Sequence, residues 1–319
     1  MDAASRTAPD LDAPHLDAGS SLPPALSGER LQTHGRAGRL GYYVAGEGRP
    51  LLLIHSINAA ANAYEVKPVF DGMTGTRRVY APDLPGFGVS ERSDRHYDPR
   101  LYTDAVHDML DVIAKDFGTE PVDALALSLS AEFLARAAME RPERFRSLAL
   151  VTPTGFTRLG SAKRKPQGTT REIPGIHKVL SWKPWSQWLF DTLTSPKSIR
   201  YFLKRTWGSD NWDRGLADYD DLAAHQPGAR YAPLAFLSGR LFSMDIRTVY
   251  ETLRMPVWLA HGTKGDFKDF SGTGWLRDRS NWSVKAYPTG ALAHFEVPGE
   301  FLADYHAFLR AAEVRTAAE

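Results

Sequence analysis

A serine at the junction of a strand pattern and a helix pattern is the residue best placed for nucleophilic chemistry. The segment VDALALSLSAEFLARAA, residues 122–138, reads as a strand up to Ser128, apolar apart from Asp123, and has helical spacing after it. Ala126 and Ser130, two positions to either side, are small, as a sharp strand-to-helix turn requires. Such a turn lifts the hydroxyl off the backbone and places the amide of Leu129 at a helix N-terminus, where it can stabilise an oxyanion. The pattern predicts acyl chemistry at Ser128, although an ordinary buried serine also fits so short a motif.

The elements around this serine alternate between short apolar strands and amphipathic helices, which predicts an α/β fold. We expect a doubly wound, mostly parallel sheet with helices on both faces. The expected strands cover residues 39–45, 51–55, 79–81, 122–127, 148–151, 257–260 and 284–287, and the expected helices cover residues 101–117, 129–140 and 300–312.

The strand pattern stops between residues 155 and 240, where Pro, Trp and basic residues interrupt short helical stretches. This break predicts a helical cap over residues 155–240, inserted into a core made of residues 30–154 and 241–319. Residues 1–29 are rich in Ala, Asp, Ser and Pro and lack an apolar period, so we expect a flexible tail there.

Several segments, in one order, resemble the α/β-hydrolase fold family. They are LLLIHSINAA (51–60), PDLPGFGVSER (82–92), the serine segment, RPERFRSLALVTP (141–153), PVWLAHGTKGDF (256–267) and GALAHFEVPGEF (290–301). The chain departs from the family pattern at both glycines beside the serine, which are Ala126 and Ser130, and at the glycine after His55, which is Ser56.

The resemblance implies a serine hydrolase of the α/β-hydrolase fold with a helical cap. Ser128 would be the nucleophile, His294 the base that takes its proton, and Asp266 the acid that orients the imidazole. The acid loop is one residue longer than the family pattern, so Asp269 is an alternative to Asp266. The resemblance thus predicts a triad in the order Ser, Asp, His.

The same resemblance suggests how a substrate would be held. The amides of Leu129 and Ile57 would form the oxyanion hole, and the hydroxyl of Ser56 would line the pocket. Trp182, Trp185 and Trp188 recur at three-residue spacing in the insertion. Such a stripe is commonly packing, but Trp185 is also placed to roof an apolar pocket.

These features favour hydrolysis of a medium-sized, largely apolar ester or related acyl compound through an acyl-enzyme. The same triad also serves carbon–carbon bond hydrolases and acyltransferases, which stay as alternatives. The altered residues around Ser128 and His55 leave open a further class, a ligand-binding member of the fold that performs no catalysis.

Composition and charge limit the classes of ligand and partner that the chain can bind. The 319 residues carry 39 Lys and Arg against 38 Asp and Glu, a net charge of +1, which argues against nucleic-acid binding. There is no cysteine, and the histidines lack metal-ligand spacing, so we expect no metal and no cofactor, only a small acyl substrate.

No apolar run is long enough for an integral membrane segment and no secretory signal is recognisable, which favours a cytoplasmic protein. Residues 155–205 hold eleven Lys or Arg against two acids, 11 − 2 = +9, which fits a solvated face or, alternatively, attraction to anions or a membrane surface.

Overall fold

The structure, a computed structural model, describes residues 22–158 and 165–318, with side chains up to residue 314. Its centre is an eight-stranded sheet in the order β1-β2-β4-β3-β5-β6-β7-β8. The strands are β1 (Glu29–Gly35), β2 (Gly38–Ala45), β3 (Arg49–Ile54), β4 (Arg77–Pro82), β5 (Val122–Leu127), β6 (Phe145–Val151), β7 (Val257–Gly262) and β8 (Trp282–Tyr287). Only β2 pairs antiparallel with its neighbours β1 and β4, and all other pairs are parallel. The predicted mostly parallel α/β sheet is confirmed.

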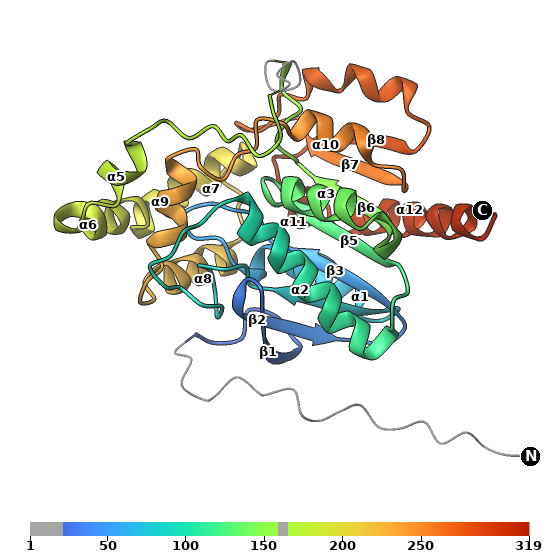
Figure 1. The fold of residues 1–319 in the computed structure, drawn as a ribbon, viewed down its shortest axis with the longest axis horizontal. Coiled ribbons are helices and arrows are strands. Elements are labelled where there is room, and N and C mark those ends of the chain that lie inside the picture. Colours follow the sequence, from blue (N-terminus) through green and yellow to red (C-terminus); the bar gives the residue numbers. More distant parts are fainter. Residues whose placement is uncertain (1–21, 159–164, 319) are drawn as a thin grey trace, which may run out of the picture.

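Helices cover both faces of the sheet (Figure 1). On one face α2 (Pro99–Phe117) and α10 (Ile246–Thr252) pack against α3 (Ser130–Glu140), and on the other α1 (Lys67–Met73) packs against α12 (Pro298–Ala318). The wholly apolar run in β3 follows from this layering. Leu52 and Ile54 join the core on the first face and Leu51 and Leu53 join the core on the second, because successive strand side chains point to opposite sides.

A further group of helices lies between β6 and β7 in the chain. It consists of α5 (Ile176–Leu180), α6 (Lys183–Leu193), α7 (Pro196–Trp207), α8 (Arg214–Ala224) and α9 (Tyr231–Leu237). Figure 1 shows these helices gathered at one end of the sheet, where α8 contacts the short helix η1 (Ala63–Val66) that follows β3. The helices fall where the sequence predicts an insertion, although residues 159–164 of that range lie outside the described residues.

The N-terminal prediction is wrong for the last part of the expected tail. Leu22, Ala25 and Leu26 are buried, and the backbone amide of Ala25 donates a hydrogen bond to the Tyr43 hydroxyl at 3.1 Å. The chain then forms β1, which the sequence analysis did not predict. Residues 1–21 of the expected tail lie outside the described part of the chain.

Candidate active site

Ser128 lies on the sharp turn that the sequence predicts. It follows the last residue of β5 and stands two positions before the first residue of α3. Its φ is +51°, a left-handed conformation that costs a non-glycine residue about 1–3 kcal/mol. Its backbone amide donates to the carbonyl of Val151 at 2.9 Å, which fixes the turn against the neighbouring strand. Ala126 and Ser130 are completely buried beside it, which explains why both are small.

A cavity of about 290 Å³ lies above this turn, between the strand ends and the inserted helices. Ser128, Ser56 and Ile57 line it, and so does Leu129. Most of the remaining wall is apolar and includes Val151, Leu203, Leu216, Phe236, Phe242, Phe267, Phe270 and Leu292. A space of this size and character fits a small, largely apolar molecule.

Two backbone amides are placed to receive an oxyanion. Within residues 22–158 and 165–318, no backbone carbonyl accepts a hydrogen bond from the amide of Leu129 or of Ile57. The amide of Leu129 is free because it precedes the first turn of α3, whose leading N–H groups have no partner inside the helix. The geometry is compatible with the predicted oxyanion hole.

The loop that carries Ile57 is held by His55. The Nε2 atom of His55 accepts from the Leu84 amide at 2.9 Å, and its Nδ1–H donates to the Ser56 carbonyl at 2.7 Å. Burial lowers the pKa of His55 to about 4, so the imidazole stays neutral. His55 therefore positions the loop and has no proton to exchange with a ligand near neutral pH.

Glu65 is a residue of the site that the sequence analysis missed. Its carboxylate accepts from the Ser56 amide at 2.7 Å, from the Ser56 hydroxyl at 3.1 Å and from the Asn58 side chain at 2.6 Å. Burial raises its pKa, and these hydrogen bonds oppose the rise. The signal was the single carboxylate in the mostly apolar run AAANAYEV, residues 59–66.

Asp220, on α8, is a second missed carboxyl group that lines the cavity. It is 6% exposed, and its Oδ1 accepts from the Asn62 side chain at 2.8 Å. Burial, with a smaller contribution from the charge of Glu65, raises the pKa of Asp220 well above its usual value. Burial thus disfavours the charged form of Asp220, which lies at the cavity wall. Its helical phase was the available signal, since Asp220 lies four residues after buried Leu216.

His294 does not face this cavity. Its side chain is completely buried, and Nε2–H donates to the backbone carbonyl of Glu65 at 2.8 Å. The Nδ1 atom has no hydrogen-bond partner among the described residues. Burial lowers the pKa of His294 to about 4, so the imidazole is neutral. In this structure His294 supports the backbone of Glu65 through this hydrogen bond. It forms no hydrogen bond with Ser128.

The loop before α12 explains this orientation. The backbone amide of Ala291 donates to the backbone carbonyl of Thr206 at 2.9 Å, and the carbonyl of Ala291 accepts from the Thr152 hydroxyl at 2.6 Å. The Gly290 amide donates to Glu296 Oε1 at 2.7 Å. These bonds turn Ala291 and Leu292 toward the cavity. The short helix α11 (Ala293–Glu296) follows at once and carries His294 inward.

The two candidate acids line the cavity but lie apart from the imidazole. Asp266 is 43% exposed in its side chain and pairs with Arg205 of α7. Asp269 is exposed and accepts from the Ser271 hydroxyl at 2.6 Å. No hydrogen bond between described residues joins either acid to His294. The structure therefore brings Ser128, Leu129, Ile57, Ser56 and Asp266 to one cavity, and it does not form the predicted Ser128–His294–Asp266 chain.

Trp185 also lies away from the cavity, because the exposed face of α6 carries it. Its Nε1–H donates to the Val179 carbonyl at 2.7 Å, and 39% of the residue is exposed. Among the described residues, no group of three or more His, Asp or Glu side chains is arranged to hold a metal ion.

Comparisons with known proteins agree with this architecture. A sequence profile described as "alpha/beta hydrolase fold" matches residues 49–202. A solved serine hydrolase involved in carbazole degradation matches 88% of this chain and 99% of its own, with a TM-score of 0.68 and 17% identity. The chain has the α/β-hydrolase fold. Another solved α/β-hydrolase, 2-hydroxy-6-oxo-6-phenylhexa-2,4-dienoate hydrolase from Rhodococcus sp. strain RHA1, has a TM-score of 0.68 at 18% identity, over 89% of this chain and all of that one.

Curated proteins match this chain over shorter segments. The 2-hydroxymuconate semialdehyde hydrolase of Pseudomonas sp. strain CF600 is 31% identical over 121 residues, 37% of this chain and 41% of that protein. The haloalkane dehalogenase of Psychrobacter cryohalolentis is 32% identical over 142 residues, 40% of this chain and 42% of that protein. The matched part thus spans about two fifths of each relative.

Proposed function

We propose that this α/β-hydrolase cleaves a small, largely apolar carbonyl compound with Ser128 as the nucleophile. The observation that carries the proposal is the left-handed backbone of Ser128 at the floor of the cavity. Strain of this kind persists only where the surrounding structure holds it, and it gathers at reactive positions. The unpaired amides of Leu129 and Ile57 supply the donors that a developing oxyanion needs.

The chemistry divides into two steps. The Ser128 oxygen bonds to the carbonyl carbon, its proton passes to a base, and the leaving group departs with a proton. Water then releases the acyl group and restores the serine. In an ester the leaving atom is oxygen. In the carbon–carbon alternative it is carbon, and the similarity to 2-hydroxymuconate semialdehyde hydrolases supports that alternative.

Hydrolysis also needs a proton acceptor at Ser128. We assign that role to His294, which follows the cavity-lining Leu292 by two positions. To reach the serine, the imidazole has to break its hydrogen bond to the Glu65 carbonyl, and α11 has to unwind. Asp266 has to break its ion pair with Arg205 and pair with the imidazole instead. In the described state these contacts hold the base away, so opening of residues 290–297 would limit turnover.

A substrate panel tests the proposal. We expect the wild-type protein to hydrolyse p-nitrophenyl esters of short and medium acyl chains, because the cavity of about 290 Å³ has no room for a long chain. A vinylogous diketone, which can only be cleaved at a carbon–carbon bond, is tested alongside the esters. Its products are analysed by mass spectrometry. Cleavage of the diketone alone would shift the assignment to the alternative, and absence of turnover with every member would contradict hydrolysis.

Binding without hydrolysis is the second candidate function. The observation in its favour is the sealed imidazole of His294, with Nε2–H already donated and Nδ1 unpartnered. On this alternative the same cavity holds a carbonyl compound reversibly at Leu129 and Ile57. Such a protein would bind the panel's ketone analogues and release them unchanged.

A further inference from the structure

Exposed apolar side chains are concentrated on the inserted helices. Of the twelve large apolar side chains that are exposed in the described part of the chain, seven fall within residues 173–202. They are Ile173, Val179, Trp182, Trp185, Trp188, Tyr201 and Phe202. Exposed hydrophobic residues scattered singly need no explanation, but a cluster of them usually marks an interaction surface.

Helix α6 has one buried face and one exposed face that carries tryptophans. Ser186 and Phe190, four residues apart, are buried against the rest of the molecule. Trp185 and Trp188, three residues apart, share the other face and are 39% and 67% exposed. The buried face packs on the molecule, and the tryptophans on the outer face stay largely exposed to solvent.

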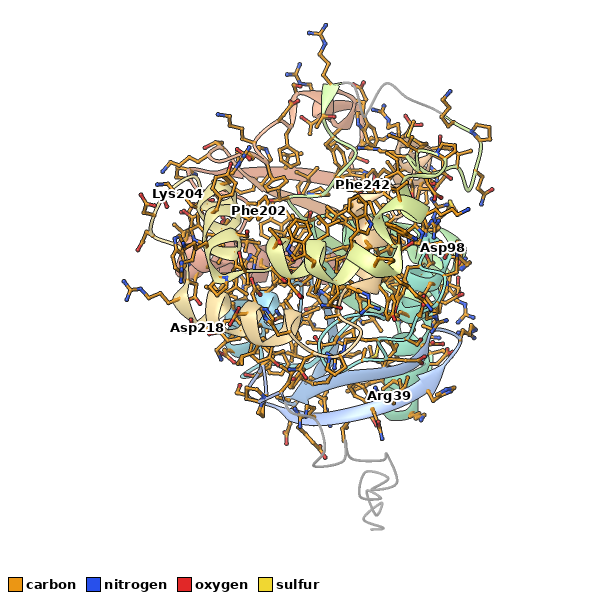
Figure 2. All side chains as sticks on the ribbon, turned by 90° about the vertical axis from the view of Figure 1, so that its left-hand side faces the viewer. Arg39, Asp98, Phe202, Lys204, Asp218 and Phe242 are labelled. Atoms are coloured by element: carbon orange, nitrogen blue, oxygen red, sulfur yellow. The ribbon has the colours of Figure 1, made fainter. Side chains whose placement is uncertain are left out.

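Helix α7 repeats this arrangement beside α6. Ile199 and Leu203 are buried, whereas Tyr201 and Phe202 are 53% and 50% exposed. Figure 2 looks onto this end of the molecule, with α6 across the front and Phe202 and Lys204 labelled beside it. Both helices thus carry exposed aromatic rings on their outer faces. We call the set Val179, Trp182, Trp185, Trp188, Tyr201 and Phe202 the tryptophan face.

The rings of the tryptophan face are ordered by one another. Trp182 and Trp185 meet edge to face with centroids 6.4 Å apart, and the Trp185 indole donates to the Val179 carbonyl. Tyr201 and Phe202 also meet edge to face, at 5.4 Å. A preformed aromatic surface loses little side-chain entropy when a partner covers it.

The segment that carries most of the tryptophan face is basic in sequence. Residues 176–207 contain six Lys or Arg and one acid, Asp191. Arg205 and Lys204 pair with Asp266 and Asp210. No described acidic side chain forms an ion pair with Lys178, Lys183, Lys197 or Arg200, all of which are exposed.

We propose that the tryptophan face docks on an anionic lipid surface. Tryptophan and tyrosine favour the headgroup region, where an apolar ring meets water, and the surrounding lysines match the negative headgroups. The attachment would be peripheral, because no helix in the described residues is long and apolar enough to cross a bilayer. Leu203 and Thr206 of α7 also line the cavity, so docking would bring the cavity wall close to the lipid.

Vesicle binding of the full chain tests this proposal. We expect co-sedimentation with phosphatidylcholine vesicles that contain phosphatidylglycerol to be at least about tenfold stronger than with phosphatidylcholine alone, and to weaken in high salt. Tryptophan fluorescence should shift to shorter wavelength on binding. Absence of co-sedimentation, or equal binding to both vesicle types, would overturn the proposal.

Matched variants assign the effect to the surface. Trp182→Ser with Trp188→Ser, and separately Lys183→Glu with Lys197→Glu, should each reduce binding about tenfold or more. Val284→Ser and Arg254→Glu change an exposed apolar and an exposed basic residue outside the tryptophan face and should leave binding unchanged. If the tryptophan variants instead dissociate a dimer observed by light scattering without lipid, the face is a contact between copies and the lipid proposal fails.

Discussion

Ser128→Ala is expected to lower kcat/KM for every substrate that the wild-type protein cleaves by about 10⁴-fold or more. The variant keeps the cavity and both candidate oxyanion donors but has no atom that can form the acyl-enzyme. Initial rates over the substrate panel, with the intact protein mass confirmed, measure the loss. A variant that retains a tenth of wild-type turnover would remove Ser128 from the mechanism.

Ser128→Gly separates strain from chemistry. Glycine also lacks the hydroxyl, so turnover should fall as far as in Ser128→Ala. Glycine adopts the left-handed backbone without steric cost, however, so its free energy of unfolding should exceed that of the alanine variant by about 1 kcal/mol. Urea unfolding of the two variants gives this difference, and equal stabilities would argue against stored strain at the turn.

His294→Ala is expected to lower the free energy of unfolding at neutral pH by about 2–4 kcal/mol. The substitution leaves a buried void and removes the hydrogen bond to the Glu65 carbonyl. Because the carboxylate of Glu65 holds the Ser56 amide, the loop beside the cavity should loosen as well. If the variant has the same free energy of unfolding as the wild type, the imidazole does not support the Glu65 loop.

The pH dependence of this loss has a defined sign. The folded pKa of His294 is lowered to about 4, whereas the unfolded chain binds the same proton at about 6.5. As pH falls from about 6.5 to 4, the unfolded state takes up a proton that the folded state refuses, so wild-type stability declines by up to about 3 kcal/mol. The difference between wild type and His294→Ala should therefore be largest above neutral pH and shrink toward pH 4.

His294→Gln divides the structural role from the catalytic one. The glutamine amide can donate to the Glu65 carbonyl but cannot accept the Ser128 proton. We expect it to recover part of the stability lost in His294→Ala, to lack the pH-dependent component, and to have no turnover. His34→Ala, at an exposed position in β1, is the matched histidine control and should change neither property.

The strands and the serine turn could be predicted because local pattern determines them. The apolar run of β3 is short and uninterrupted from Pro50 to Ile54, and β5 is apolar apart from Asp123. Such runs are typical of strands in a sheet that is covered on both faces. The small residues around Ser128 likewise report a local crossing of strand and helix. By contrast, β1 buries only Leu31 among its seven residues, so its sequence carries little apolar alternation.

The positions of the base and the acid could not be predicted, because distant residues determine them. His294 is turned inward by bonds from its loop to Thr152 and Thr206, which come from other parts of the chain. Asp266 is drawn to Arg205, 61 residues earlier in the inserted helices. The sequence shows that a serine, an acid and a histidine follow one another in the expected order. Tertiary contacts decide whether their side chains come together.

Reaction of the folded wild-type protein with a fluorophosphonate, followed by peptide mass mapping, tests the central claim most directly. If Ser128 is a nucleophile served by His294, a single covalent adduct should form at Ser128, and it should form far more slowly in His294→Gln. If the folded protein stays unlabelled at Ser128 while a ketone analogue still binds in the cavity, the account of Ser128 as a nucleophile is contradicted and reversible binding replaces it.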